Sequence, residues 1–472
     1  MNKQKFCKQI SFLLIILFLS IFVFQEYVVA QTLKWTQTEN LSTRPDGAGS
    51  ITSDADYIYV AGYDYVPSST DCRWRIEKRR KDTGAIVWTQ ISNPSSLGDG
   101  PNAITSDSDY LYIGGADYNC TGYPQWRIEK RRKSDGGLVW AQTVNPGSNV
   151  DYVTAIVADG LYLYVVGQDT TLGGVNYQWR IEKRRKDTGA LVSGWPIVSN
   201  PSNNASSAEY PTAVVVDSAY IYVCGGDYAP GNFQWRIEKR TKDTGALVSG
   251  WPATVNPTAN GDVPYDMVGD SDYLYIVGQQ NLTSSLPMSG SWRIEKRSKI
   301  NGALIWSQVV NPESGVNLAW TVSLDGSSVY ISGYANWFGD GKWYIEKRKK
   351  SDGTLDSNWP VTENPSTGFD GVDGILFDSG SLYIVGSDNL PGNYQWRIER
   401  RDLGFIDIGL RFWDGSSAVK IAAEPANPPT SAMRIAKEGI VYGLALVDTT
   451  DSMASKIRVQ TSSGVKSLRK LE

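Results

Sequence analysis

A six-residue string that returns seven times is the feature that most constrains the fold of this chain. The string Trp-Arg-Ile-Glu-Lys-Arg begins at five tryptophans, and close variants begin at Trp343 and Trp396. The five identical copies begin at Trp74, Trp126, Trp179, Trp235 and Trp292. Successive copies lie 51 to 57 residues apart. A period of this length is typical of propellers and other repeat architectures.

Each repeat contains four short strand signals separated by turn residues. In the second unit, the signals cover residues 103–106, 110–114, 125–131 and 138–143. Four short strands in each unit predict one blade of a β-propeller. The seven units therefore predict an all-β chain with a seven-bladed propeller over residues 31–402.

The position of a second repeated tryptophan predicts how the ring closes. This tryptophan follows six copies of the string but not the copy at Trp396. Its counterpart lies at the other end of the chain, at Trp35, 53 residues before Trp88. We therefore predict that the N-terminal strand completes the seventh blade as its outermost strand. This closure leaves no broken sheet at the seam.

Two motifs within the repeat resemble those of known families. Residues 82–88 read Asp-Thr-Gly-x-x-x-Trp, which is similar to the repeat of quinoprotein-like propellers. Residues 107–114 resemble the repeat of secreted bacterial β-propeller proteins. The resemblance implies a propeller fold and does not extend to catalysis. Quinoprotein dehydrogenases use adjacent cysteines and usually eight blades, whereas this chain has no adjacent cysteine pair and seven repeats.

The first thirty residues have the pattern of a secretory signal peptide. Lys3, Lys5 and Lys8 precede an apolar run over residues 10–24. Val28-Val29-Ala30 offers small residues for cleavage before Gln31. The alternative is an uncleaved anchor, but a spanning helix needs about 20 apolar residues. We expect a secreted or cell-surface protein with no transmembrane segment after cleavage.

Composition excludes several classes of function. The chain has no histidine, which excludes Ser-His-Asp triads and histidine-ligated metal sites. Without the leader, 43 basic residues face 49 acidic ones, a net charge of −6. A mildly acidic chain is not expected to bind nucleic acid or anionic lipid.

Three cysteines follow the leader, and an oxidising compartment permits one disulfide among them. Cys72 and Cys120 lie in equivalent loops of adjacent repeats and are the candidate pair. Cys224 lies in a strand pattern, and we expect it to be a small buried residue.

Residues that recur in every blade are expected to build the fold. Side chains alternate along a strand, so Trp126, Ile128 and Lys130 share one face, and Arg127 and Glu129 share the other. We expect Trp and Ile to fill the gap between blades, and the charged residues to form ladders near the rim. The functional alternative is a basic belt that binds polyanions. The glutamate in each copy argues against this alternative.

An aspartate ends most of the second strands and is a weak candidate metal ligand, because Ca²⁺ prefers oxygen donors. These residues are Asp64, Asp117, Asp169, Asp227 and Asp388. The alternative is that each carboxylate accepts hydrogen bonds from loop backbone N–H groups. We expect no cofactor, and calcium is the exception left open.

Aromatic residues outside the repeat positions mark a candidate binding site in the sixth blade. Trp320 is expected just before the first strand of this blade, and Trp337 in the loop between its second and third strands. Tyr334 and Phe338 are their neighbours in the chain. Exposed aromatic rings bind sugars and form hot spots for proteins. The alternative is that these rings pack on one another or against the C-terminal segment.

The repeat pattern stops after Arg401. Residues 403–472 contain five strand patterns and are expected to form a small sandwich-like β domain. It could dock on the propeller, attach the protein to the cell surface or serve in export.

These observations favour an exported, non-catalytic and monomeric binding or scaffold propeller that recognises a glycan or a cell-surface protein through its loops. One alternative is an extracellular carbohydrate-active hydrolase or lyase that uses two carboxylates. A glycosidase needs them roughly 5–5.5 or 6.5–9.5 Å apart. The other alternative is a structural component of the cell envelope.

Overall fold

The computed structural model describes residues 31–403 except 67–68, 70, 119–122, 148, 174–176, 203–208 and 284–287. It also describes the backbone of six strands after residue 405. The predicted leader, residues 1–30, lies outside the described residues. In the part of the chain that is described, no helix is long and apolar enough to span a membrane.

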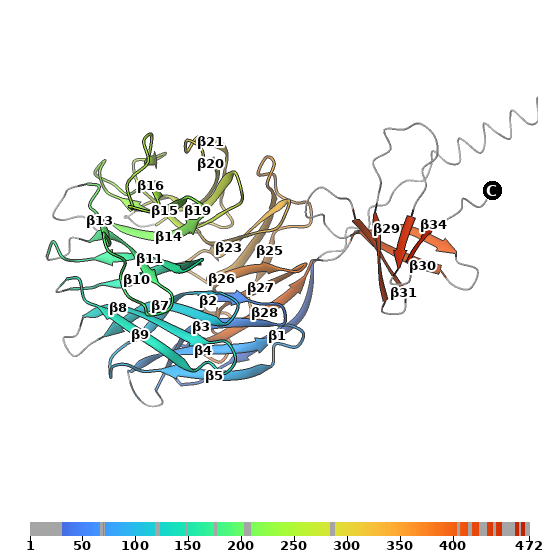
Figure 1. The fold of residues 1–472 in the computed structure, drawn as a ribbon, viewed down its shortest axis with the longest axis horizontal. Helices are drawn as coiled ribbons and strands as arrows, with labels where there is room; N and C mark the ends of the chain where they lie inside the picture. The colour runs from blue at the N-terminus through green and yellow to red at the C-terminus, as the bar shows by residue number, and fades with distance from the viewer. Residues whose placement is uncertain are drawn as a thin grey trace, which may run out of the picture. The chain divides into compact units, whose positions relative to one another are not determined.

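Seven four-stranded sheets are arranged as blades around a ring (Figure 1). In the first six sheets the strands are ordered from the innermost to the outermost as they follow along the chain, and consecutive strands are antiparallel. Blades 1 to 3 consist of β2 (Gly47–Ser53), β3 (Tyr57–Tyr65), β4 (Cys72–Arg80) and β5 (Ile86–Ser92); β6 (Gly100–Ser106), β7 (Tyr110–Tyr118), β8 (Pro124–Arg132) and β9 (Leu138–Val144); and β10 (Tyr152–Asp159), β11 (Tyr162–Asp169), β12 (Gln178–Arg185) and β13 (Ile197–Ser199). Blades 4 to 6 consist of β14 (Tyr210–Val216), β15 (Tyr220–Asp227), β16 (Gln234–Thr241) and β17 (Ala253–Val255); β18 (Gly261–Gly269), β19 (Tyr273–Leu282), β20 (Ser291–Ser298) and β21 (Leu304–Val310); and β22 (Leu318–Leu324), β23 (Ser328–Ala335), β24 (Lys342–Lys349) and β25 (Val361–Glu363).

The seventh blade confirms the predicted closure of the ring. It consists of β26 (Gly371–Asp378), β27 (Ser381–Asp388), β28 (Gln395–Asp402) and β1 (Thr32–Glu39), with β1 outermost beside β28. The Trp35 indole lies 6.2 Å from the Tyr383 ring, and its Nε1 donates to the Lys81 carbonyl of blade 1 at 3.0 Å. The seven-bladed, all-β fold predicted from the repeats is therefore confirmed.

The face of each third strand that carries Trp and Ile packs against the next blade, as predicted. Trp126 and Ile128 are fully buried in one cluster with Val153 and Val165 of blade 3. The Trp126 Nε1 donates to the Gln168 carbonyl of blade 3 at 2.8 Å. Full burial of a Trp side chain requires such an acceptor, because an indole N–H left without a partner is costly.

The charged residues on the opposite face of the third strand were predicted to form ladders near the rim, and this prediction is wrong in location. Glu129 is fully buried and accepts from Arg127 at 2.8 Å and from Arg131 at 2.7 Å. It also accepts from Ser92 Oγ of the preceding blade at 2.6 Å. The charged residues are therefore buried between blades, where each one is paired, and they do not form an exposed basic belt. Alternation along the strand shows which side chains share a face, but not what covers that face.

Lysines link adjacent blades on the side of the ring where the first and second strands of each blade are joined. Lys130 Nζ donates to the Lys186 carbonyl of the next blade at 2.9 Å and lies 3.8 Å from the Tyr110 ring centroid. Lys186 forms an ion pair of 2.6 Å with Asp107 of the preceding blade. The basic side chains thus contribute to the packing of the ring.

After Leu403, six strands pair in chain order in one sheet. They are β29 (Ile406–Trp413), β30 (Ala418–Ala423), β31 (Ala432–Lys437), β32 (Ile440–Ala445), β33 (Arg458–Thr461) and β34 (Gly464–Ser467). The sequence suggested five strands in a sandwich-like arrangement. The structure adds a sixth strand, and the described strands form a single sheet.

We predict that Glu129→Gln destabilises the propeller by about 3 kcal/mol. Removing one partner of a buried ion pair leaves the other charge uncompensated, and both Arg127 and Arg131 depend on Glu129. Denaturation by guanidinium chloride measures the loss. Asp135→Asn in the same blade is the control. Its pair with Arg132 is exposed, and little change in stability is expected. Equal stability of the two variants would contradict the structural role of the buried pair.

Candidate functional site

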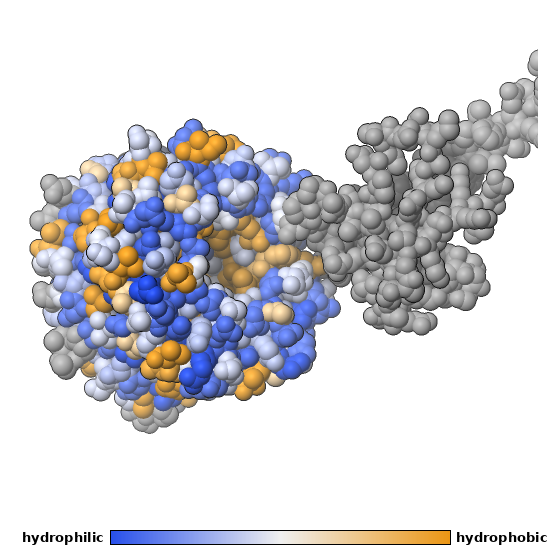
Figure 2. Space-filling view, viewed as in Figure 1, coloured by the Kyte–Doolittle hydropathy of each residue, from blue (hydrophilic) through white to orange (hydrophobic). Residues whose placement is uncertain are grey.

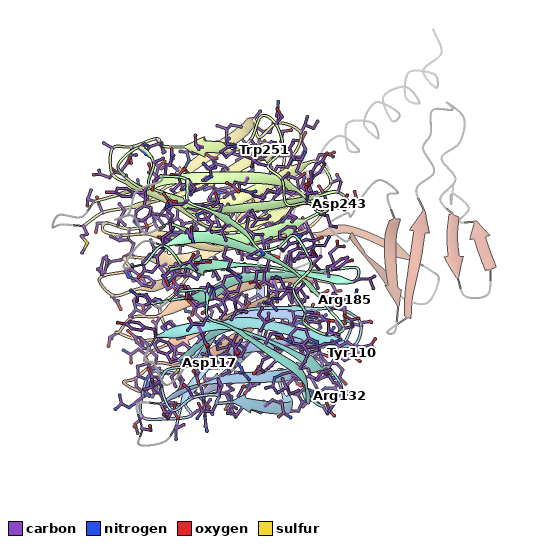
Figure 3. All side chains as sticks on the ribbon, turned by 60° about the vertical axis from the view of Figure 1, so that its left-hand side comes forward. Tyr110, Asp117, Arg132, Arg185, Asp243 and Trp251 are labelled. Atoms are coloured by element: carbon purple, nitrogen blue, oxygen red, sulfur yellow. The ribbon has the colours of Figure 1, made fainter. Side chains whose placement is uncertain are left out.

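The two sides of the ring carry different connections. The loops between second and third strands, and the connections between blades, emerge on one side, which we call the loop face. The tight turns emerge on the opposite side, the turn face. Figure 3 shows this division, with Asp117 at the loop-face end of β7, and Tyr110, Arg132 and Arg185 at the turn face. All four predicted aromatic site residues lie at or near the loop face.

A polar side chain at the start of each first strand anchors the loop face. Sequence reasoning missed these residues, although one precedes or begins every first strand. They are Asp46, Asp99, Asp151, Glu209, Asp262, Asn317 and Asp370. Asp99 accepts from the backbone N–H of Tyr118 at 2.8 Å and of Ser95 at 3.1 Å. Burial raises the pKa of Asp99 to about 6, despite these hydrogen bonds.

The five aspartates proposed as weak metal candidates form ion pairs with the repeated arginine. Asp169 lies 3.0 Å from Arg180, and its Oδ1 accepts from the Thr171 backbone N–H at 2.7 Å. The second contact is the loop bond expected from the sequence. The other four aspartates also pair with arginines of their own blades. Among the described residues, no group of three or more acidic or cysteine side chains could hold a metal ion.

The sixth blade lacks both members of this ion pair. Ala335 replaces the aspartate and Tyr344 replaces the arginine, and the Tyr344 ring packs edge-on against Trp292 at 5.2 Å. In the fifth blade, Gln280 takes the place of the aspartate and accepts from Arg293 at 2.8 Å. Because the sixth blade lacks both residues together, the aspartate of the other blades is best explained as the ion-pair partner of the arginine and not as a metal ligand.

One position differs among the blades while the residues around it repeat. Every first strand carries a β-bulge at this position. The bulge residues, which we call the bulge ring, are Gly49, Asn102, Thr154, Thr212, Tyr265, Trp320 and Asp373. Each innermost strand contacts the innermost strands of its two neighbours. A bulge re-aims a side chain and is common beside functional sites. The bulge ring is therefore the variable element of an otherwise repeated fold.

Six aromatic rings from blades 5 to 7 form a continuous aromatic cluster at the loop face. Its members are Tyr265, Trp320, Tyr334, Trp337, Phe369 and Tyr394. Ring centroids are 4.8 Å apart for Tyr265 and Trp320, and 4.4 Å for Tyr334 and Trp337. Trp320 and Trp337 are stacked with an interplanar angle of 20°. These rings therefore pack on one another, which was one of the two interpretations that the sequence left open.

The chain around the cluster is shaped to hold it. Asn336 adopts φ of 59°, a left-handed conformation that Asn tolerates better than most residues. The following Trp337 backbone N–H donates to the Val316 carbonyl at 2.7 Å. A Cβ added at Gly371 would lie 2.6 Å from the Tyr334 ring and 3.1 Å from Phe369. Glycine is therefore required at 371 for these two rings to pack.

The structure places the four predicted aromatic residues in different environments. Trp320 lies within β22 at the bulge, not before the strand as expected, and is partly exposed. Trp337 lies in the predicted loop and is partly exposed. Tyr334 is buried, with 3% of its surface exposed, whereas Phe338 is 64% exposed. Tyr334 supports the site from beneath, and the other three side chains reach the surface.

One carboxylate adjoins the aromatic cluster. Asp373 of the bulge ring accepts a hydrogen bond from the Tyr334 hydroxyl. Burial raises the pKa of Asp373 to about 6, and the hydrogen bond opposes this shift. Burial and then the charge of Asp373 raise the pKa of Tyr63 in blade 1. Asp373 therefore lies between aromatic residues of the sixth and first blades.

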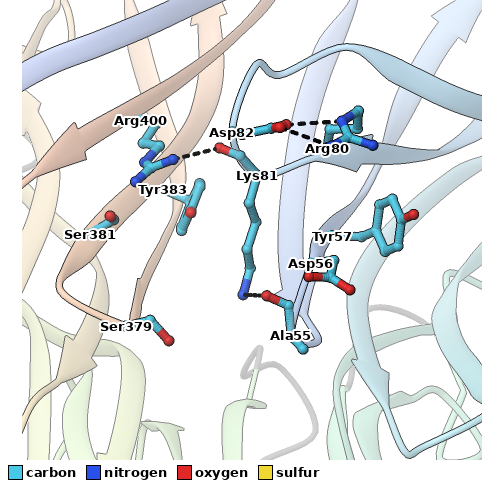
Figure 4. Close-up of a pocket in the computed structure, with 10 residues that line it drawn as sticks. All are labelled: Ala55, Asp56, Tyr57, Arg80, Lys81, Asp82, Ser379, Ser381, Tyr383 and Arg400. Carbon is cyan, nitrogen blue, oxygen red and sulfur yellow. Dashed lines mark hydrogen bonds and ion pairs between the residues drawn. The ribbon is translucent and has the colours of Figure 1, made fainter. Parts of the chain in front are cut away.

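The described surface of the ring is concave in more than one place. Figure 2 shows a hollow within the ring, with hydrophobic surface beside it. A separate pocket of about 460 Å³ lies on the turn face between blades 7 and 1 (Figure 4). Its basic residues are already paired, Arg80 with Asp82 at 2.8 Å and Arg400 with Asp402 at 2.8 Å. The loop face is therefore the stronger candidate site.

The structure tests one of the two cysteine predictions. Cys224 is fully buried, as expected. Cys120 lies outside the described residues, so the Cys72–Cys120 disulfide stays a prediction.

Comparisons with known proteins find solved structures whose fold is similar to that of this chain. No family model matches the sequence, and no curated protein sequence matches it. Solved structures similar to it include Drosophila Semaphorin 1b extracellular domains 1–2, with 7% identity, a TM-score of 0.47, and coverage of 80% of this chain and 88% of that one. Chaetomium thermophilum Sqt1 bound to the N-terminus of ribosomal protein L10 has 8% identity, a TM-score of 0.43, and coverage of 84% and 97%. A subtype N10 neuraminidase-like protein of A/little yellow-shouldered bat has 11% identity, a TM-score of 0.40, and coverage of 78% and 99%. The assignment to the seven-bladed β-propellers rests on the sheet topology, and the comparisons carry no argument about function.

We predict that Asp99 makes the propeller less stable as pH rises. Its pKa is higher in the folded state, about 6, than in the unfolded chain, about 4. The stability that its protonated form contributes is present below pH 4 and is lost as pH rises through 6. Relative to Asp99→Asn, wild type is expected to lose about 2 kcal/mol between pH 4 and pH 7.

Urea denaturation at several pH values measures this difference. Asn317 occupies the equivalent position in blade 6. Asn317→Asp is therefore the reciprocal variant, and its stability should fall as pH rises more steeply than that of wild type. Parallel stability profiles for wild type and Asp99→Asn would contradict the prediction.

Proposed function

We propose that this protein is an exported, non-catalytic binding propeller that recognises a glycan or a cell-surface protein through its loop face. The observation that carries the proposal is the restriction of the aromatic cluster to blades 5 to 7. Seven nearly identical blades need no such cluster for packing, because the repeated Trp and Ile residues already fill the gaps between them. Variable loops on a rigid scaffold are where binding usually resides.

The cluster has the physical properties of a binding platform. Trp320 and Trp337 are partly exposed, and Phe338 extends beside them with most of its surface in solvent. Contacts with Tyr334 and Phe369 hold Trp337 in place before any ligand arrives. Binding on such a surface costs little side-chain entropy, because the rings are already ordered.

Hydrolysis receives less support than binding. A carboxylate-based glycosidase needs two carboxyl groups about 5 to 10 Å apart across the substrate. Among the described residues, no second carboxylate is close enough to shift the pKa of Asp373. The resemblance of the repeat to quinoprotein-like propellers concerns the construction of the blades, and we propose no quinone chemistry. The proposed binding requires no cofactor, and we propose that the protein acts as a monomer.

We predict that Phe338→Ala weakens ligand binding at least tenfold. An exposed aromatic residue at the centre of a binding surface often contributes about 2 kcal/mol, or roughly 30-fold in affinity. Binding of the mature protein to a glycan array and to intact cells of the source organism is the measurement. Trp337→Ala should have a similar effect, provided that thermal unfolding shows that its blade remains folded.

Ile300→Ala is the matched control. Ile300 is 83% exposed in the turn between β20 and β21, on the turn face, and its removal should leave binding unchanged. Equal binding by wild type, Phe338→Ala and Trp337→Ala would remove the aromatic cluster from the proposal. Recovery of the protein only inside fractionated cells would contradict export.

A further inference from the structure

We propose that Asp373 makes the loop-face site specific for a cationic group, the ammonium of a lysine or the guanidinium of an arginine carried by a peptide segment of the partner. This inference rests on the proposed function and chooses between its two ligand classes. It follows from the place of Asp373 in the bulge ring, from the lack of an ion-pairing cation beside it among the described residues, and from the aromatic residues near it.

Asp373 is the charged member of the bulge ring. The other six members are Gly, Asn, two Thr, Tyr and Trp, and none of these side chains is charged at neutral pH. Asp373 follows Val372 at the bulge in β26 and is partly exposed. A charged side chain that occurs at this position in one blade only is not needed for the repeated packing.

The buried glutamates of the third strands have cationic partners, and a buried loop-face carboxylate such as Asp99 is instead held by several loop N–H and hydroxyl groups. Glu77 accepts from Arg75 and Arg79 at 2.6 Å each, and Glu129 has the same two kinds of partner. Asp373 has a hydrogen bond from the Tyr334 hydroxyl. Among the described residues, no lysine or arginine forms an ion pair with it. The charge of Asp373 is therefore available to a ligand.

Another carboxylate beside a bulge has a different set of partners. Asp266 follows the bulge residue of blade 5 and accepts three hydrogen bonds, from the Met267 N–H at 2.8 Å, the Val322 N–H at 2.9 Å and Thr321 Oγ1 at 3.1 Å. The bonds from Val322 and Thr321 join the innermost strands of blades 5 and 6. The carboxylate of Asp266 is thus used in hydrogen bonds within the propeller. The carboxylate of Asp373 accepts one such bond and can accept further hydrogen bonds from a ligand.

The surroundings of Asp373 suit a cation. Tyr334 donates a hydrogen bond to Asp373, and the Trp320 ring packs on Tyr334 with centroids 5.8 Å apart. The charge of Asp373 also raises the pKa of Tyr63 from the first blade. Aromatic rings attract ammonium and guanidinium groups through the negative face of the ring. A cation beside Asp373 would also offset the cost of keeping this carboxylate ionised away from bulk water. A neutral sugar hydroxyl offers a hydrogen bond but no compensating charge.

The titratable groups that face Asp373 are the hydroxyls of Tyr334 and Tyr63. Burial and the Asp373 charge raise the pKa values of both hydroxyls, so they stay protonated near neutral pH. Deprotonation of Asp373 around pH 6 is consequently the ionisation that controls the site. Binding of a cation is expected to strengthen as pH rises from 5 to 7.

The test uses the mature protein and fluorescent peptides of one neutral sequence that differ at a single central residue: Lys, Arg, acetyl-lysine or Gln. Wild type is expected to bind the Lys and Arg peptides at least tenfold more tightly than the Gln and acetyl-lysine peptides. The preference should grow about tenfold between pH 5 and pH 7. Asp373→Asn should lose both the preference and its pH dependence. Asn102 occupies the equivalent bulge in blade 2, so asparagine fits this backbone.

Asp82→Asn is the control, since Asp82 is an exposed carboxylate on the turn face, and it should retain the preference. The inference is overturned if wild type binds none of the peptides, shows no preference for a cation, or keeps the preference after Asp373→Asn. If glycan binding is instead abolished by Phe338→Ala and unaffected by Asp373→Asn, the proposed function stands and this inference fails. Thermal unfolding of each variant confirms that the comparison is made on folded protein.

Discussion

The structure depends on one interaction that is made seven times, the contact of a buried indole with the next blade. Each third-strand tryptophan fills the space between two sheets, and its Nε1 donates to a carbonyl of the following second strand. The bond from Trp396 to the Tyr63 carbonyl, 2.9 Å long, joins the last blade to the first. The same bond elsewhere, as from Trp74 to Ala116 at 3.0 Å, joins neighbours in sequence. Burial of a large polar aromatic is stable only while its acceptor is in place, so each blade needs its neighbour and the ring must close.

Charges within the repeated framework are balanced locally. Each buried glutamate of the third strands has at least one arginine partner on the same strand, and the turn-face lysines have aspartates in the preceding blade. A chain with so many basic residues in a repeated pattern therefore presents little free positive charge. The repeated charged residues are therefore occupied by the fold. The blades differ at the bulge ring and the aromatic cluster, which are the better candidates for a specific function. Because the framework holds every first strand in place, a different side chain at each bulge leaves the fold unchanged.

Much of the fold, and part of the candidate site, could be predicted. The tryptophan spacing predicted the number of blades and the closure by the segment around Trp35. The odd tryptophans, Trp320 and Trp337, pointed to the sixth blade. The prediction for the charged face of the third strand was wrong in location, since Glu129 lies between blades and not near the rim. Asp373 was missed because a single aspartate in a strand pattern carries no local signal of its surroundings.

The sequence alone determined the blade, its repetition and its seam, because strand alternation, turn residues and repeat spacing are local properties of the chain. The tertiary structure alone decided which of the remaining residues meet. Tyr334 and Asp373 are 39 residues apart and belong to different blades, and Tyr63 comes from the far end of the propeller sequence. Their proximity arises from the curvature of the closed ring and from the bulges that redirect the first strands, and neither property can be read from spacing along the chain.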